Sequence, residues 1–320
     1  MTDTKVAVLV PGRMHPRALA RLKDAFDVIE ASAAEIPSLP EEVRGRVRGA
    51  ATANSMSATW MDLFPQLEIV SNFGVGYDGV DSKHAGTKGI LVTNTPDVLN
   101  DEVADTTIGL LINTVRRLPV AEQYLREGRW EKEGPFPLSP LSLKNRHVGL
   151  VGLGRIGMEI AKRLEPFKVK ISYHTRSKRD VVSYDYYGSV KELAAAVDTL
   201  ISIIPGTPET HKIINAEVLE ALGPNGVFIN VGRGWSVDED ALIAALKADK
   251  IAAAGLDVFY DEPRVPAGLL TLPNVSVLPH VASASVPTRN DMADLVVDNL
   301  IAWFSEKKVL TPVPETPVKR

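Results

Sequence analysis

Four polar side chains stand at or just beyond the ends of predicted strands in the last third of the chain: Arg233, Asp257, Glu262 and His280. In open parallel α/β sheets, ligands bind beyond the carboxyl ends of the strands. A carboxylate beside an imidazole favours the protonated ring and fixes its orientation, which gives a general acid near neutral pH. A guanidinium group nearby can bind the carboxylate of a 2-keto acid. Each residue alone also fits a structural role, but together they favour catalysis.

A glycine pattern in the middle of the chain indicates a dinucleotide site. Gly152, Gly154 and Gly157 follow a short apolar run and open a helical pattern. These glycines allow a tight turn, a close approach of the backbone to a pyrophosphate, and close packing of helix on strand, while the helix N-terminus attracts the phosphates. The next strand lies at the distance that the motif requires. The alternative is that the glycines serve only a tight strand-to-helix turn.

The end of that next strand predicts which dinucleotide is bound. An acidic side chain is expected there, because it accepts hydrogen bonds from the ribose 2′-hydroxyl. The chain has Thr175, Arg176 and Ser177 instead, and no acid at 174–178. A guanidinium group can pair with a 2′-phosphate and stack on adenine. We therefore expect NADP(H) to be preferred over NAD(H); the alternative is a solvated surface charge.

Apolar runs and helical patterns alternate along the chain, which is typical of βαβ units and a parallel sheet. The fold class is therefore α/β with two open, doubly wound parallel sheets. Strands are predicted at 5–10, 47–54, 67–74, 90–96, 147–153, 168–175, 199–206, 226–233, 252–259 and 275–280. A long helix interrupted at Pro119 is predicted over 101–128, and an amphipathic helix that needs a partner surface over 288–304.

Composition excludes several classes of protein. The net charge of −4 over 320 residues leaves no basic surface for nucleic acid, and no apolar segment is long enough to span a membrane. The absence of cysteine excludes disulfides, thiolate zinc sites and thiol nucleophiles, and no HExxH pattern is present, so no metal site is expected. With no pattern typical of a secretory signal, we expect a cytoplasmic protein.

An ordered set of blocks resembles the D-isomer-specific 2-hydroxyacid dehydrogenases, and most closely the glyoxylate/hydroxypyruvate reductases and the related hydroxyphenylpyruvate reductases. The blocks are SNFGVGYDGVD (71–81), VTNTPDVLNDEVADTTIGLL (92–111), HVGLVGLGRIG (147–157), FINVGRGWSVDEDAL (228–242), AAGLDVFYDEP (253–263) and VLPHVAS (277–283). The resemblance implies two Rossmann-like domains with the active site in the cleft between them. It implies a substrate-binding domain at 1–99 and 287–320, and an NADP-binding domain at 100–286.

The resemblance also implies roles for individual residues. Arg233 corresponds to the substrate-binding arginine, Glu262 to the acid that orients the histidine, and His280 to the proton donor. Val75 and Gly76 match the loop whose backbone amides bind the substrate carboxylate. The residues that match the family's cofactor contacts are Thr107 near the nicotinamide, Leu153, Gly154, Arg155 and Ile156 at the pyrophosphate, Pro205 beneath the adenosine, and Val231 and Asp257 at the nicotinamide amide.

An apolar, proline-rich segment within 118–146 predicts a homodimer. It carries Trp130, Phe136, Leu138 and Leu141, which a monomer would leave partly exposed. The resemblance implies an arm that embraces a second subunit, and the alternative is an arm folded on its own domain.

Several functions remain open at this level. A small 2-keto acid such as glyoxylate or hydroxypyruvate is the expected substrate. An aromatic 2-keto acid is the alternative, because Tyr77, Trp235 and Trp303 could fill the pocket or line a larger one. Phosphoglycerate dehydrogenases often have an added regulatory domain, and formate dehydrogenases have glutamine at the place of Glu262. The same scaffold also serves as a nucleotide-sensing corepressor, which is a binding protein.

Overall fold

The chain forms two compact units in a computed structural model that describes residues 5–317. The first unit comprises Met1–Leu99 and Ser285–Arg320, and the second comprises Asn100–Ala284. Residues 1–4 and 318–320 lie outside the described part. The second unit is thus inserted in the first. The boundary lies two residues before the predicted one, where Ser285 accepts a hydrogen bond from the Thr288 amide and caps the last helix.

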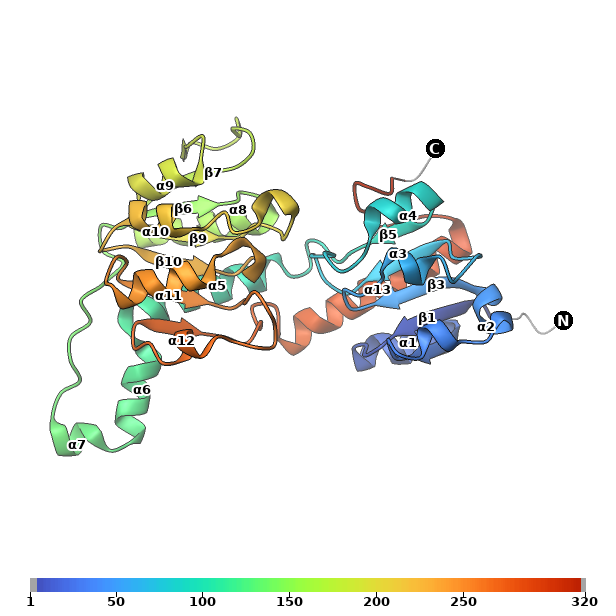
Figure 1. Ribbon diagram of the computed structural model, residues 1–320, viewed down its shortest axis with the longest axis horizontal. Helices are drawn as coiled ribbons and strands as arrows, with labels where there is room; N and C mark the ends of the chain where they lie inside the picture. Colours follow the sequence, from blue (N-terminus) through green and yellow to red (C-terminus); the bar gives the residue numbers. More distant parts are fainter. Residues whose placement is uncertain (1–4, 318–320) are drawn as a thin grey trace. The chain divides into compact units, whose positions relative to one another are not determined.

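The first unit is built on a five-stranded parallel sheet with the order β2-β1-β3-β4-β5 (Figure 1). Its strands are β1 (Ala7–Pro11), β2 (Asp27–Ala31), β3 (Val47–Thr52), β4 (Ile69–Asn72) and β5 (Leu91–Thr93). Its shorter helices are α1 (Pro16–Ala25), α2 (Glu41–Arg46), α3 (Ala58–Met61) and α4 (Ser82–Lys88). Side chains alternate between the two faces: Val8 and Val10 belong to one hydrophobic core and Leu9 to the other.

Helix α13 (Val286–Glu306) covers one face of this sheet together with α1. Ala293, Val296 and Leu300 are fully buried in the core there. Arg21 of α1 forms ion pairs with Asp294 and Asp298 on α13. The final helix predicted from the sequence is therefore present, and its partner surface is the first unit's own sheet.

The second unit contains a seven-stranded parallel sheet with the order β12-β11-β10-β9-β6-β7-β8. Its strands are β6 (His147–Val151), β7 (Lys170–His174), β8 (Asp185–Tyr186), β9 (Thr199–Ser202), β10 (Val227–Asn230), β11 (Ala253–Leu256) and β12 (Val275–Val277). Strands β6 and β9 are neighbours, and the strand order runs outward from this pair in both directions. Ligands bind at such a switch point in open α/β sheets. The glycine pattern follows β6.

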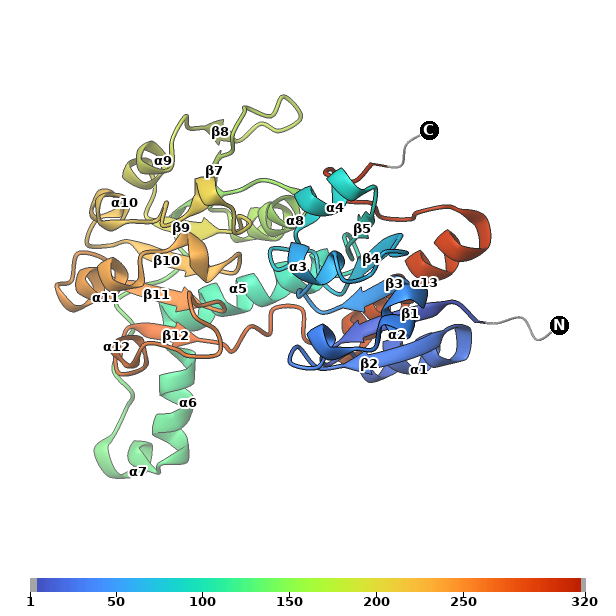
Figure 2. The same cartoon turned by 45° about the vertical axis from the view of Figure 1, so that its right-hand side comes forward.

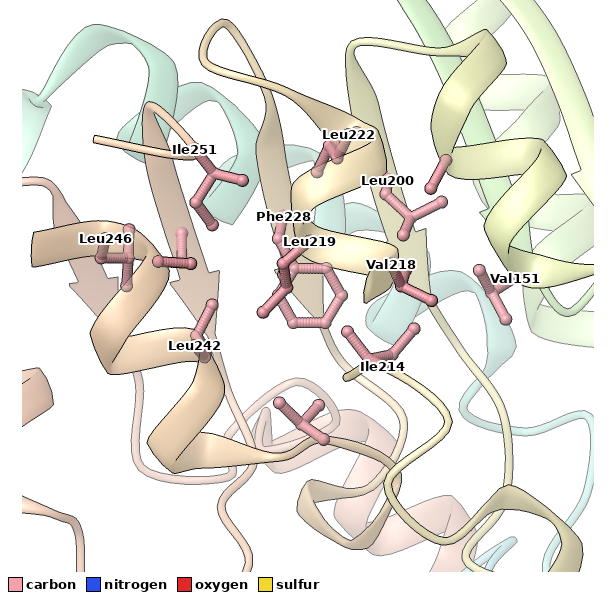
Figure 3. Packing of buried hydrophobic residues seen from close by; sticks show 14 of the residues in the cluster. Val151, Leu200, Ile214, Val218, Leu219, Leu222, Phe228, Leu242, Leu246 and Ile251 are labelled. Carbon is pink, nitrogen blue, oxygen red and sulfur yellow. The ribbon is translucent and has the colours of Figure 1, made fainter. Parts of the chain in front are cut away.

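Helices pack on both faces of the larger sheet. One face is covered by α5 (Asn100–Arg116) and α8 (Arg155–Leu164). The other is covered by α9 (Val190–Ala196), α10 (Ala216–Leu222), α11 (Glu239–Lys247) and α12 (Ala267–Leu270). Figure 3 shows Phe228 of β10 among Val218 and Leu219 of α10 and Leu242 of α11. These buried side chains fix the strand ends from which the functional loops begin.

An arm projects from the rest of the second unit (Figures 1 and 2). It consists of α6 (Leu118–Arg126), α7 (Arg129–Glu133) and the returning segment to residue 146. The prediction of one helix interrupted at Pro119 was wrong in detail. Helix α5 ends at Arg116, Arg117 takes a left-handed conformation (φ 55°), and Pro119 lies in the first turn of α6. Proline is tolerated there because first-turn amides have no acceptor within the helix.

Among residues 5–317, no helix combines the length and the apolar character that a membrane span requires.

Candidate active site

The loop after β10 fixes the backbone of Arg233. Asn230, the last residue of the strand, accepts a hydrogen bond from the Gly232 amide and donates one to the Arg233 carbonyl, each of 3.1 Å. The Ser236 hydroxyl donates to the same carbonyl at 2.8 Å. The guanidinium Nη1 donates to the Gly232 carbonyl. Hydrogen bonds within the loop therefore fix the backbone from which the Arg233 side chain extends.

Gly234 brings the loop after β10 against the loop after β11. A Cβ atom at Gly234 would lie 1.9 Å from the carbonyl carbon of Phe259, so no other residue fits without displacing a backbone. Phe259 in turn donates its amide to Oε1 of Glu262 at 3.0 Å. The glycine after Arg233 thus has a packing reason that the sequence motif alone does not reveal.

Glu262 and His280 form a hydrogen-bonded pair, as the sequence predicted. Glu262 Oε2 lies 2.6 Å from Nδ1 of His280, and both side chains are partly exposed. Burial acts to raise the pKa of Glu262. The hydrogen bonds from His280 and from the Phe259 amide, with the charges of His280 and Arg233, outweigh burial, so its pKa is lowered. The carboxylate is therefore ionised at neutral pH and orients the imidazole.

Asp257 anchors the backbone around His280. Its carboxylate is fully buried and accepts the amides of Val281 and Ala282 at 2.7 and 2.9 Å, while its carbonyl accepts the His280 amide at 2.8 Å. Burial raises the pKa of Asp257, although the two amide hydrogen bonds oppose this. The sequence placed His280 at the end of a strand, but β12 ends at Val277 and His280 has a positive φ of 54°. Three hydrogen bonds accepted by Asp257 hold the turn at His280. The sequence analysis missed this role of Asp257.

The glycine turn after β6 meets the three steric demands of a dinucleotide site. Gly152 has a φ of 102°. A Cβ atom at Gly157 would lie 2.4 Å from the Gly152 carbonyl oxygen, so α8 packs closely on the strand end. At Gly154, the N-cap of α8, a Cβ atom would meet nothing within 4 Å, and no side chain caps the helix there. Helix amides at an open N-terminus fit a pyrophosphate.

Most of the other predicted cofactor residues lie at the same sheet edge. Leu153, Arg155 and Ile156 belong to the glycine turn and the first turn of α8, with Leu153 fully buried. Pro205 follows β9 and is exposed, and Val231 follows β10 directly. Thr107 differs from these, because it lies within α5. Its hydroxyl is buried and donates to the Val103 carbonyl at 2.7 Å.

Thr175, Arg176 and Ser177 follow β7, the strand beside β6. Thr175 is partly buried, whereas Arg176 and Ser177 are exposed. The Thr175 hydroxyl donates to the Ser177 carbonyl at 2.6 Å. The first acidic residue after the strand is Asp180.

In the first unit, the loop after β4 presents the amides of Val75 and Gly76. Asn72 donates to the Gly76 carbonyl at 2.9 Å, and Asn94 donates to the Val75 carbonyl at the same distance. Within residues 5–317, neither amide of this pair has an acceptor in the chain. Two adjacent N–H groups on a loop fixed by its carbonyls fit a carboxylate.

The three aromatic residues considered for the pocket have separate places. Trp235 donates its indole N–H to the Thr207 carbonyl at 2.9 Å and stacks on Tyr260 at 5.4 Å between ring centroids. Both rings of this stack are exposed. Tyr77 donates to Glu315. Burial, and next to it the charge of Glu315, raises the pKa of Tyr77 to about 12.

Trp303 donates to Glu68, which lies before the amino-terminal end of β4. It is thus at the edge of the first sheet opposite to Val75 and Gly76.

The fold and these loops define a dinucleotide-dependent oxidoreductase, and comparison with known proteins specifies the family. The family model described as D-isomer specific 2-hydroxyacid dehydrogenase, NAD binding domain, matches residues 108–282. The chain is 53% identical over 256 residues to the hydroxyphenylpyruvate reductase of Plectranthus scutellarioides, over 80% of this chain and 81% of the relative. It is 49% identical over 267 residues to a glyoxylate/hydroxypyruvate reductase A of Arabidopsis thaliana, over 83% and 84%. The chain therefore belongs to the D-isomer-specific 2-hydroxyacid dehydrogenase family.

A solved structure agrees with this assignment. The NADPH-dependent glyoxylate/hydroxypyruvate reductase of Sinorhizobium meliloti, in complex with NADP and malonate, superimposes with a TM-score of 0.96 at 59% identity. The match covers 99% of both chains. The family and the α/β fold class predicted from the sequence are thus confirmed.

Proposed function

We propose that this protein is an NADPH-dependent reductase that converts glyoxylate and hydroxypyruvate to the corresponding 2-hydroxy acids, with the D configuration where the product is chiral. The observation that carries this proposal is the 2.6 Å contact between Glu262 and His280. The loop that carries Glu262 packs against the loop of Arg233 at Gly234, and Asp257 anchors the backbone at His280. Similar proteins from Plectranthus, Arabidopsis and Sinorhizobium are named as reductases of 2-keto acids.

In the proposed reaction, the chain binds the keto acid and supplies a proton. Arg233 pairs with the substrate carboxylate and keto oxygen, and the amides of Val75 and Gly76 bind the carboxylate. Because Nδ1 of His280 is engaged by Glu262, its Nε2 donates the proton to the keto oxygen. The carboxylate of Glu262 stabilises the charged ring that must be present before the transfer.

The cofactor residues are proposed on the fit of the glycine turn. Gly152, Gly154 and Gly157 with the first turn of α8 would hold the pyrophosphate, and Arg176 would pair with the 2′-phosphate. Bound NADPH supplies the hydride that reduces the keto carbon. The remaining residues that we propose to contact the cofactor are Thr107, Leu153, Arg155, Ile156, Thr175, Ser177, Pro205, Val231 and Asp257.

A second candidate substrate class is aromatic 2-keto acids. The exposed stack of Trp235 on Tyr260, in the loops that follow Arg233 and precede Glu262, favours this alternative. Ranking kcat/KM with NADPH for glyoxylate, hydroxypyruvate and hydroxyphenylpyruvate tests the order. Preference for the aromatic acid would reverse it. No turnover with any 2-keto acid would favour a binding protein of the corepressor kind.

We also propose a homodimer held by the arm. Trp130 on α7 is 60% exposed and Leu138 on the returning segment is 94% exposed, whereas Leu141 packs on the core of its own unit. Exposed apolar side chains of this kind are typical of a subunit interface, and a two-fold dimer would bury those of both subunits. Light scattering should give a particle of twice 34.7 kDa at micromolar concentration; a particle of 34.7 kDa would refute the dimer. A cytoplasmic location stays a prediction.

A further inference from the structure

The turn at 175–179, which carries the residues proposed to bind the 2′-phosphate, is closed by a buried phenol. Tyr173 on β7 is fully buried, and its hydroxyl interacts with both backbone groups of Arg179. It accepts the Arg179 amide at 2.8 Å and donates to the Arg179 carbonyl at 3.3 Å. One side chain from the strand thus fixes the far end of the turn.

A second phenol fixes the near end of the same turn. Tyr186 on β8 donates its hydroxyl to the Thr175 carbonyl at 3.2 Å. Its ring lies 5.5 Å from that of Tyr173, its neighbour across the strand pair, and stacks on His174 at 6.4 Å. Inside the turn, the Thr175 hydroxyl donates to the Ser177 carbonyl. The backbone on both sides of the exposed Arg176 is therefore held in place by side chains of the sheet.

A rigid turn has a consequence for affinity. Ordering a loop on binding opposes complex formation, so a loop that is already fixed in its bound form binds more tightly. We infer that Tyr173 and Tyr186 are positioning residues that set the preference for NADPH over NADH, because they hold the turn that presents Arg176 and Ser177. Neither phenol needs to touch the cofactor. This inference rests on the proposed NADPH specificity.

Three single tyrosine-to-phenylalanine variants of the full chain test the inference. Tyr173→Phe and Tyr186→Phe remove only the hydroxyl and keep the packed ring. Tyr184→Phe is the matched control, because the hydroxyl of Tyr184 donates to Glu165 at 2.6 Å, a residue outside the turn. For each variant, the dissociation constants of NADP⁺ and NAD⁺ are measured by titration calorimetry, and kcat/KM is measured with NADPH and with NADH.

The two turn variants should each weaken NADP⁺ binding by roughly three- to tenfold, the range expected for losing one or two hydrogen bonds. The dissociation constant of NAD⁺ should stay within about twofold of the wild-type value, because NAD⁺ has no 2′-phosphate to accept hydrogen bonds from the turn. The kcat/KM ratio of NADPH to NADH should fall by the same factor. Tyr184→Phe should leave the ratio unchanged.

Two results would overturn the inference. Unchanged dissociation constants for both NADP⁺ and NAD⁺ in both turn variants would show that the phenols do not act on the phosphate turn. Equal weakening of both nucleotides would show a general structural role. If the wild-type protein itself shows no preference for NADPH, the proposed cofactor specificity fails as well. The wild-type measurement separates that failure from a failure of the two tyrosines alone.

Discussion

Glu262 holds His280 while it is itself held: Oε2 lies 2.6 Å from Nδ1 of the imidazole, and Oε1 accepts the amide of Phe259 at 3.0 Å. Both carboxylate oxygens are thus engaged, and one ring nitrogen remains for the substrate. Since Asp257 also fixes the backbone of His280, the position of this proposed proton donor is determined at both the main chain and the side chain.

Replacing His280 with alanine should separate catalysis from cofactor binding. Loss of the proton donor should lower kcat by roughly 10²–10⁴-fold, the usual contribution of a general acid. The dissociation constant of NADPH should change little, because the glycine turn and the turn at 175–179 are untouched. Steady-state kinetics and fluorescence titration check both values. Turnover near the wild-type level at neutral pH would mean that the proton comes from another group.

Glu262→Gln keeps the shape of the side chain and removes its charge. The imidazolium loses its partner, so we expect kcat to fall by at least about tenfold and the alkaline limb of the rate–pH profile for reduction to move to lower pH. An unchanged profile with a lower kcat would assign Glu262 a purely geometric role.

The same variant should change the pH dependence of stability. The pKa of Glu262 is lowered in the folded state, so its contribution is present above the ordinary glutamate pKa and is lost as the pH falls through the lowered value. Wild type and Glu262→Gln should therefore differ most in free energy of unfolding near neutral pH and converge in acid. Urea titrations between about pH 3 and pH 7, a range that spans this transition, measure the difference.

Arg233→Lys tests the guanidinium fork while keeping the positive charge. A lysine cannot bind a carboxylate with two parallel hydrogen bonds. We expect KM for the keto acid to rise and kcat to fall together, because the same fork serves the bound substrate and the transition state. The KM for NADPH is the internal control and should hold steady. A variant with normal kcat/KM would remove Arg233 from the site.

The glycine turn predicts opposite phenotypes for two similar substitutions. Gly157→Ala places a Cβ atom 2.4 Å from the Gly152 carbonyl oxygen, so it should lower the melting temperature. Among residues 5–317, the Cβ atom of Gly154→Ala meets nothing within 4 Å, so the fold should keep its stability while the methyl group hinders a bound pyrophosphate and weakens NADPH binding. Calorimetry with and without NADPH distinguishes the two. A stable Gly154→Ala variant with normal affinity would place the pyrophosphate elsewhere.

The sequence predicted the interior strands of both sheets, and β5 and β12 at one edge of each sheet, because each is a short apolar run between turn residues. It missed β2 and β8, which lie at the edges of their sheets. β2 is only partly buried and β8 has two residues, so neither carries a strong apolar pattern. An edge strand without an apolar run is fixed only by pairing with a neighbour, which the local sequence does not reveal.

The candidate site shows the same limit. Arg233, Glu262 and His280 were predicted as site residues because their residue types suit the chemistry and because they follow strands. The anchoring by Asp257 of the turn that carries His280 was missed, since it depends on contacts between residues more than twenty positions apart. The two phenols that close the turn at 175–179 were missed because a tyrosine in a strand is normally assigned to the hydrophobic core, without a hydrogen-bonding role.

Arg176→Ala is the direct test of cofactor choice. If the guanidinium pairs with the 2′-phosphate, its loss should remove a charge-assisted contact of roughly 1.5–3 kcal/mol, or about ten- to a hundredfold in KM for NADPH. The KM for NADH should hardly change, because NADH has no phosphate at that position. Thr175→Asp should go further, since a carboxylate there accepts from the ribose hydroxyl and repels the phosphate. Assays at equal low concentrations of both cofactors decide the matter: a wild-type protein that works better with NADH would show that Arg176 is a surface charge without a role in cofactor binding.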